Sequence, residues 1–170
     1  MASSVDHIRQ LREETSCGVI ECKKALEESK GDFQKAKEVL RKRGLEMAVK
    51  KADRVAKEGR VEAYIHNGNK MGVIVEVNCE TDFVARNDDF IAFTRDLAMH
   101  VAAVAPKYLK KEDVPADEPN RDDFAKANCL LLQGFVKDPS KTIGDYLNEL
   151  VAKTGENVQI GRFIRFKIGE

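Results

Sequence analysis

The chain has 170 residues, and its 29 lysines and arginines are matched by 29 aspartates and glutamates. This balance argues against direct, sequence-independent binding of nucleic acid, which needs an excess of positive charge beside the phosphates. The composition, 42% hydrophobic and 34% charged, is typical of a globular protein, and the sequence has no run of about 18 apolar residues that could cross a membrane.

The amino terminus and the cysteines both indicate the cellular compartment in which the protein is expected. The first residues lack the apolar block of a signal peptide. None of the four cysteines has the two-residue spacing of a zinc ribbon or a redox motif, so we expect buried thiols in a reducing compartment. We therefore expect a cytoplasmic protein, from a bacterial cytosol or from an organelle after processing, without a membrane partner.

Residues 4–44 contain three segments in which apolar residues recur at helical spacing, which predicts three short helices. Gly18 permits a turn, Gly31 breaks the second helix, and Gly44 is expected to end the third. The inner faces are expected to carry Val5, Ile8, Leu11, Val19, Cys22, Ala25, Leu26, Phe33, Ala36, Val39 and Leu40. A domain of residues 1–44 has a very small core, so it serves more often for docking than for catalysis.

Ile20 lies off the apolar stripe of the second helix, with Lys23 three positions further on. An exposed aliphatic side chain beside a lysine hints at a docking face. Isolated apolar residues are also common on protein surfaces, so the spacing alone leaves both interpretations open.

Residues 41–60 form a strongly basic block, with eight basic residues and three acidic ones. We predict that residues 45–59 form a solvated linker helix, which is the common meaning of such a run, and that Gly59 ends it. A nucleic-acid contact is the alternative, but no aromatic residue is interleaved to stack on bases.

Residues 60–170 predict a second domain of the α+β class, in which helices cover a three-stranded antiparallel sheet. Alternating and clustered apolar residues predict strands at 61–66 and 71–79. Asn67 and Gly68 stand between these strands and predict a hairpin turn.

Two helices and a last strand complete this second domain. Apolar spacing predicts a helix that begins near Asn87, is capped by Asn87 or Asp88 and covers the hairpin. Thr142 with Asp145 fits the start of another helix. The last strand is expected to place on one face Val158, Ile160, Ile164, Phe166 and Ile168. Arg162 and Phe163 disturb that alternation, so a bulge or packing on both faces is expected there.

Residues 80–87, ETDFVARN, connect the second strand to the following helix. Asp82 and Phe83 belong to the pattern of neither element. A bulky aromatic on a short loop is one way in which a rigid domain pushes a wedge into a partner. In the other interpretation, Phe83 folds back to fill the end of its own domain and Asp82 is a turn residue or a helix cap.

No constellation of catalytic or metal-ligating residues stands out. His66 and His100 are isolated, and Cys17 and Cys22 with His7 lack a fourth ligand for zinc. The sequence also lacks a glycine-rich phosphate loop and a nucleophile with its base. We therefore expect no enzyme, no cofactor and no metal site.

Five segments, in this order, resemble the elongation factor Ts family, the bacterial and organellar nucleotide-exchange partners of the translation GTPase elongation factor Tu. They are LREETSCGVIECKKALEE at 11–28, KKADRVAKEG at 50–59, EVNCETDFVARN at 76–87, QGFVKDPSKT at 133–142 and KTGENVQIGRF at 153–163. Together they span nearly the whole chain, which makes the resemblance far more specific than any single motif.

The resemblance implies a ubiquitin-associated-like three-helix domain, then a core domain, acting as a guanine-nucleotide exchange factor in translation elongation without chemistry of its own. It implies that the first domain docks on elongation factor Tu, GDP-bound or nucleotide-free, and that the core loop inserts near the phosphate and magnesium end of the nucleotide site. By position, the docking face is Arg12, Val19, Ile20 and Lys23, the intruding pair is Asp82 and Phe83, and further core contacts come from Gly155 and Asn157.

A core of residues 60–170 is short for this family. Since short members tend to pair, we expect a homodimer, with the final strand supplying an edge. Two other functions remain as alternatives: an adaptor that binds protein partners through the three-helix domain, and an RNA-binding module that uses residues 41–60. An adaptor has no use for Phe83, and an RNA-binding module predicts a steep dependence on salt.

Overall fold

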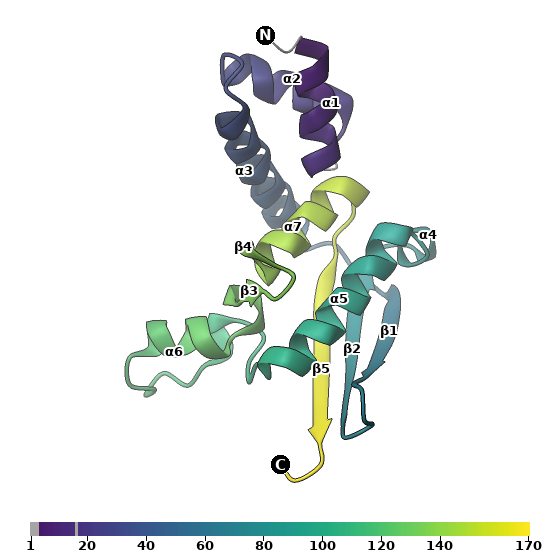
Figure 1. Cartoon of the computed structure of the whole chain (residues 1–170), viewed down its shortest axis with the longest axis vertical. Coiled ribbons are helices and arrows are strands. Elements are labelled where there is room, and N and C mark those ends of the chain that lie inside the picture. The colour runs from purple at the N-terminus through teal and green to yellow at the C-terminus, as the bar shows by residue number, and fades with distance from the viewer. Residues whose placement is uncertain (1–3, 16) are drawn as a thin grey trace. The chain divides into compact units, whose positions relative to one another are not determined.

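The computed structural model describes residues 4–15 and 17–170, and the chain divides into two compact units (Figure 1). The first unit is formed by Met1–Asp53 with Asn148–Asn157. The second is formed by Arg54–Leu147 with Val158–Glu170. Each has its own apolar core, and no helix in the described part of the chain is long and apolar enough to cross a membrane.

The first unit contains the three helices that the sequence predicts: α1 (Ser4–Thr15), α2 (Val19–Glu28) and α3 (Phe33–Lys51). Asp32 caps α3, because its side chain accepts a hydrogen bond from the backbone N–H of Lys35 at 3.0 Å. The small core consists of Leu11, Cys22, Ala25, Leu26, Ala36 and Leu40.

Helix α3 corrects the prediction that Gly44 ends the third helix. It continues through Gly44 to Lys51, and Gly44 is buried inside it. A Cβ at this glycine would lie 3.6 Å from the Cβ of Ala152, which is an ordinary van der Waals contact. Gly44 therefore does not terminate the helix, and its neighbours leave room for a methyl group.

The basic segment is not a separate helix: the helix predicted for residues 45–59 is present only as far as Lys51, as the end of α3. Residues 45–51 continue α3, and residues 52–57 connect to the first strand. Gly59 is the second residue of that strand and has a φ of +150°. A Cβ there would lie 2.2 Å from the carbonyl oxygen of Val77, so only glycine fits this close backbone approach.

The second unit is built on a three-stranded antiparallel sheet in the order β1-β2-β5. Its strands are β1 (Glu58–Ile65), β2 (Met71–Cys79) and β5 (Gln159–Lys167). The predicted hairpin joins β1 to β2, and Gly68 and Asn69 adopt positive φ in the connection. The α+β class is confirmed.

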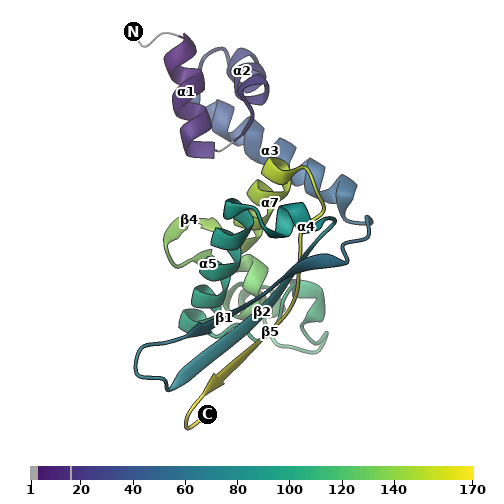
Figure 2. The same ribbon diagram turned by 90° about the vertical axis from the view of Figure 1, so that its right-hand side faces the viewer.

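Helix α5 (Asp88–Val104) covers one face of this sheet (Figures 1 and 2). Of the two predicted caps, Asn87 and Asp88, it is Asn87 that caps α5, since its side chain accepts from the backbone N–H of Asp89 at 2.8 Å. The buried side of α5 carries Phe90, Phe93, Leu97 and Val101. The strands opposite contribute Val73, Val75, Val77 and Ile160 to the same core.

Strand β5 corrects the prediction that five apolar residues share one face. Ile160 pairs with Val77 but Arg162 pairs with Glu76, so Gly161 is an extra residue that forms a bulge. A one-residue insertion exchanges the two faces of a strand. Ile160 is therefore buried, whereas Ile164 and Phe166 lie exposed on the open face.

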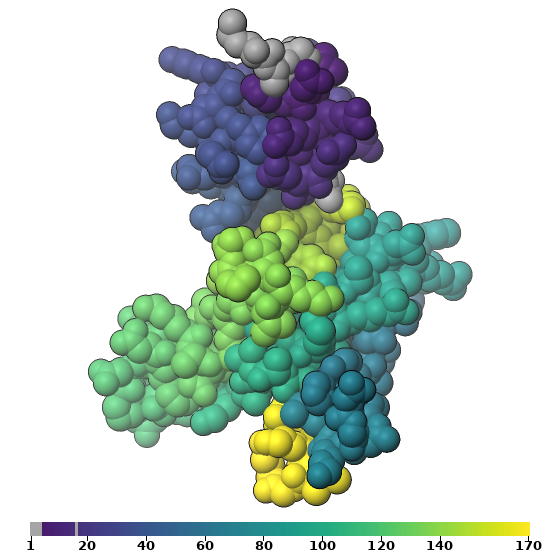
Figure 3. Space-filling model, viewed as in Figure 1, coloured from purple at the N-terminus to yellow at the C-terminus, as the bar shows by residue number. Residues whose placement is uncertain are grey.

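The remaining elements of the second unit lie on both sides of α5 in the chain. Helix α4 (Asp82–Ala85) precedes α5. After α5 come η1 (Lys111–Asp113), α6 (Arg121–Asn128), η2 (Leu130–Leu132), β3 (Gly134–Phe135), β4 (Asp138–Thr142) and the start of α7 (Ile143–Thr154). The predicted start of α7 is confirmed, since Thr142 and Asp145 bond to each other's backbone N–H at 3.0 and 3.1 Å. Figure 3 shows the β1–β2 connection beside the C-terminal residues, where the N–H of Ile168 donates to the carbonyl of Lys70 at 2.9 Å.

Candidate partner-binding site

Residues 80–87 form a short helical projection at the end of β2. Helix α4 holds Asp82 and Phe83 in its first turn, and Thr81 precedes it in extended conformation. The side chain of Phe83 is 82% exposed, which is the highest exposure among the large apolar residues of the described chain. The interpretation in which Phe83 fills the end of its own domain is therefore wrong, and the exposed ring is available to a partner.

Asp82 is neither a turn residue nor the cap of this helix. Thr81 is the cap, because its hydroxyl oxygen accepts from the N–H of Val84 at 3.5 Å. The carboxylate of Asp82 instead forms an ion pair with Arg86 at 3.0 Å, one turn later. The side chains of Arg86 and Asp82 are 80% and 47% exposed, so this pair stabilises α4 only weakly.

Three of the four residues of the predicted docking face, Val19, Ile20 and Lys23, lie on α2 in the first unit. Val19 and Ile20 are 50% and 69% exposed, and Lys23 follows one turn later with an ion pair to Glu27 at 3.9 Å. Val19 was predicted on the inner stripe, but the buried side of α2 begins one turn later, at Cys22. The structure thus brings Val19, Ile20 and Lys23 together as an apolar patch with a cation on it.

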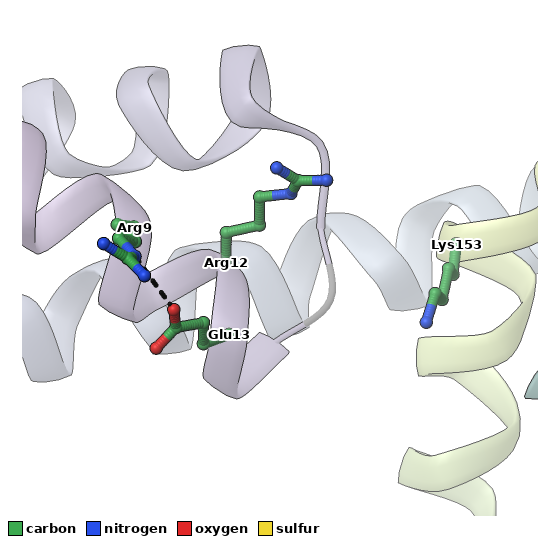
Figure 4. A pocket seen from close by; sticks show the side chains of 4 residues that line it. All are labelled: Arg9, Arg12, Glu13 and Lys153. Atoms are coloured by element: carbon green, nitrogen blue, oxygen red, sulfur yellow. Dashed lines mark hydrogen bonds and ion pairs between the residues drawn. The ribbon is translucent and has the colours of Figure 1, made fainter.

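Arg12 lines a hollow of about 400 Å³ in the first unit, together with Arg9, Glu13 and Lys153 (Figure 4). Arg9 is paired with Glu13 at 3.1 Å. In Figure 4 this pair lies to one side of Arg12 and Lys153 lies to the other. Three cations with one carboxylate leave an excess of positive charge, which suits an acidic group on a partner.

Gly155 and Asn157 follow α7 in the first unit. Gly155 has a φ of +72°, and its carbonyl accepts a hydrogen bond from the ammonium group of Lys51. Asn157 is only 3% exposed, and its amide donates to the carbonyl of Ala52 at 3.3 Å. Asn157 therefore holds the turn before β5 in place, and Gly155 is the more accessible of the two to a partner.

These site residues fall into two groups. Arg12, Val19, Ile20, Lys23, Gly155 and Asn157 belong to the first unit, and Asp82 and Phe83 belong to the second. In the described part of the chain no cluster of three potential metal ligands occurs, and all the cysteines are free thiols. Burial raises the pKa of Cys17, Cys22 and Cys129, so these thiols are held in their unreactive, protonated form.

The exposed ring of the second unit, and the apolar patch and excess of cations of the first unit, are each suited to binding a protein. Sequence comparison identifies the family. A family model described as elongation factor TS matches residues 5–123 and 118–170. The chain belongs to the elongation factor Ts family.

Individual elongation factor Ts sequences agree over nearly the whole chain. The protein of Carboxydothermus hydrogenoformans is 46% identical over 190 aligned positions, which cover 96% of this chain and 88% of the relative. The protein of Thermoanaerobacter sp. is 46% identical over 98% of this chain and 95% of the relative. The protein of Geobacter metallireducens is 47% identical over 100% of this chain and 91% of the relative. The alignments are longer than this chain, so these elongation factor Ts proteins carry residues that it lacks.

Two groups at the elongation factor Ts loop were missed from the sequence. Thr81 was not recognised as the cap of α4, although threonine is a preferred residue at that position. Arg86, the partner of Asp82, was also missed, although a spacing of four residues places opposite charges on one helical face. The capping preference of Thr81 and the spacing of Asp82 and Arg86 can be interpreted only once α4 is known to be a helix.

Proposed function

We propose that this chain is a guanine-nucleotide exchange factor for elongation factor Tu and promotes the release of GDP. The name shared by its relatives supports a role in translation elongation. The observation that carries the mechanism is the 82% exposed ring of Phe83 on a helix anchored to the sheet. The proposal requires no cofactor and places the protein in the cytosol, where translation takes place.

The two groups of site residues have different roles in this proposal. The patch of Val19 and Ile20, with Arg12 and Lys23 around it, docks the first unit on elongation factor Tu. Exposed apolar side chains supply the affinity and the cations select an acidic surface. Asp82 and Phe83 then enter near the phosphate and magnesium end of the nucleotide site, where contacts to GDP are strongest.

Thermodynamic linkage explains how such a wedge acts. If the factor weakens GDP binding by a given ratio, GDP weakens binding of the factor by the same ratio. A hundredfold effect corresponds to about 2.7 kcal/mol, which a ring that displaces a phosphate loop or a magnesium ligand can supply. The factor must therefore dock with enough affinity to remain bound while GDP leaves.

The direct test follows the release of fluorescent GDP from elongation factor Tu over a range of concentrations of this protein. The wild type should accelerate release by orders of magnitude. Phe83→Ala should lower the maximal rate at least about tenfold, because it removes the group that acts in the nucleotide site. It should keep the circular dichroism spectrum and thermal midpoint, since an exposed ring contributes little to the fold.

Val136→Ala is the matched control, because Val136 is an exposed apolar residue of the second unit outside the proposed contact residues. It should exchange nucleotide like the wild type. A normal maximal rate for Phe83→Ala would contradict the wedge and favour the adaptor function, in which only the first unit matters. A steep loss of binding with added salt would favour a polyelectrolyte contact by the basic segment instead.

We also propose that a second copy of this chain covers the open face of the sheet. Helix α5 covers one face only, and the other face carries the exposed apolar residues Val61, Ala63, Ile65, Ile74, Ile164 and Phe166, with the ion pair of Arg162 and Glu76 beside them. A contiguous apolar patch of this kind marks an interface. A two-fold axis would pack it against its own copy, which needs no complementary partner surface.

A further inference from the structure

The position of the Phe83 ring is set by the backbone beneath it. A side chain that is 82% exposed packs little against its own protein, so neighbouring side chains do not fix where it points. Helix α4 has only four residues. A single helical turn is unstable by itself, because it fixes several residues for very few hydrogen bonds. Contacts outside α4 must therefore hold it.

Thr81 makes contacts at the start of this turn through two different groups. Its carbonyl accepts from the N–H of Ala85 at 3.3 Å, and its hydroxyl oxygen accepts from the N–H of Val84 at 3.5 Å. These bonds satisfy two donors of the first turn, including that of the residue next to Phe83. Thr81 itself is extended, with φ −130° and ψ 154°, a conformation that suits a β-branched residue.

The same carbonyl is tied to the core of the sheet. The thiol of Cys79, the last residue of β2, donates to the carbonyl oxygen of Thr81 at 3.1 Å. Cys79 is completely buried. At the other end of the turn Ala85 is buried, and the N–H of Asn87 donates to the carbonyl of Val84 at 3.0 Å. Helix α4 is thus fixed at both ends while Phe83 projects between them.

We propose that Thr81 is a positioning residue for nucleotide exchange: it joins the rigid end of β2 to α4 and holds the Phe83 ring in the orientation that enters the partner. The inference rests on the function proposed above. Thr81 acts through Phe83, so its loss lowers the rate at which bound partner releases GDP and leaves docking by the first unit unchanged. Cys79 supports the same carbonyl from the core.

The test separates the maximal rate of GDP release from the concentration of factor that gives half of it. Thr81→Val keeps the branched shape but removes the hydroxyl acceptor, and should lower the maximal rate about fivefold, the effect of a typical lost helix cap. The half-saturating concentration should stay within about twofold, since the docking patch is on α2. Thr81→Ser restores the acceptor and should restore the rate.

Thr142→Val is the matched control, because Thr142 caps α7 in the same way that Thr81 caps α4. Thr142→Val should lower the thermal midpoint at least as much as Thr81→Val does, and it should leave the maximal rate of GDP release unchanged. Amide hydrogen exchange gives a local readout: Val84 and Ala85 should lose protection in Thr81→Val and keep it in Thr142→Val.

Two results overturn the positioning role while leaving the proposed function intact. In one, the wild type accelerates GDP release and Thr81→Val reaches the same maximal rate. In the other, Thr142→Val slows release as much as Thr81→Val, so that general destabilisation explains both. If the wild type itself fails to accelerate release, the exchange function fails, and the positioning role fails with it.

Discussion

His100 is a buried titratable residue with no part in the proposed exchange mechanism. It is fully buried on α5, and its Nε2 atom lies 3.1 Å from Oε1 of Gln133. The amide nitrogen of Gln133 donates to the carbonyl of Ala127, so the amide oxygen faces His100 and Nε2 carries the proton. The Nδ1 atom is then a buried acceptor without a partner in the described structure. Burial lowers the pKa of His100, and the Gln133 hydrogen bond opposes this effect.

The lowered pKa of His100 predicts that the protein loses stability in mild acid. The unfolded chain binds a proton near the ordinary value of 6.5, whereas the folded chain binds it only at lower pH. The free energy of unfolding should therefore fall as the pH drops below 6.5, by at most about 1.4 kcal/mol per pH unit from this group. Urea unfolding at about pH 7.5 and about pH 5.5 measures the loss.

His100→Gln is the control for this prediction, because it keeps a hydrogen-bonding side chain and removes the titrating ring. The wild type should lose more stability between the two pH values than the variant does. Equal losses would show that other groups, such as the carboxylates, account for the whole dependence.

At the scale of elements, the sequence predicted those features that depend on local signals. The α+β class, the hairpin around Gly68 and the caps at Asn87 and Thr142 follow from residues close to one another in the chain, and all are confirmed. The prediction of which residues share a face of β5 was wrong, because a single extra residue, Gly161, reverses the alternation of side chains. Its role is tertiary: a Cβ there would lie 2.6 Å from the side-chain oxygen of Asn78 on the neighbouring strand.

The candidate site shows the same division between local and tertiary information. The residues in ETDFVARN could be singled out because Phe83 belongs to no apolar stripe. Spacing could not decide whether the ring is buried or exposed, because both states place it at the same point in the chain. The exposure depends on Thr81 and Ala85, which fix a helical turn too short to have a periodicity of its own.

Helix α3 gives a prediction at this scale, because Gly44 lies inside it and not at its end. Glycine in a helix interior costs about 0.5–1 kcal/mol relative to alanine. A Cβ at Gly44 would make ordinary contacts of 3.6 Å with Ala152 and with the carbonyl oxygen of Asn148. Gly44→Ala should therefore raise the free energy of unfolding by up to about 1 kcal/mol, measured by urea unfolding.

Gly59→Ala is the opposite case and tests the same reasoning. Its Cβ would lie 2.2 Å from the carbonyl oxygen of Val77 in a conformation that favours glycine, so this variant should be destabilised. If Gly44→Ala also destabilised the protein, the space beside α3 would be smaller than the structure indicates.

At the scale of the whole molecule, the proposed docking and the proposed insertion belong to units with separate cores. The docking patch is on α2 and the wedge is on α4, in the first and second units respectively. Because the two are covalently joined, binding of the first unit raises the effective concentration of the second at the partner. In the proposed mechanism a weak insertion then suffices, because the wedge can disturb the nucleotide site without itself binding tightly.

The open sheet face predicts that the protein is a homodimer. Light scattering should give a mass of about twice the 19.1 kDa of one chain, falling towards the monomer mass on dilution.

Ile164 pairs with Ile74 on the exposed face, so Ile164→Glu would bury a carboxylate in the interface and should yield a monomer. Val136→Glu adds the same charge away from that face and should remain dimeric. A wild type that is monomeric at every concentration, or an Ile164→Glu variant that still pairs, would exclude this interface. Because the wedge residue Phe83 is outside the patch, the monomeric variant should still exchange nucleotide.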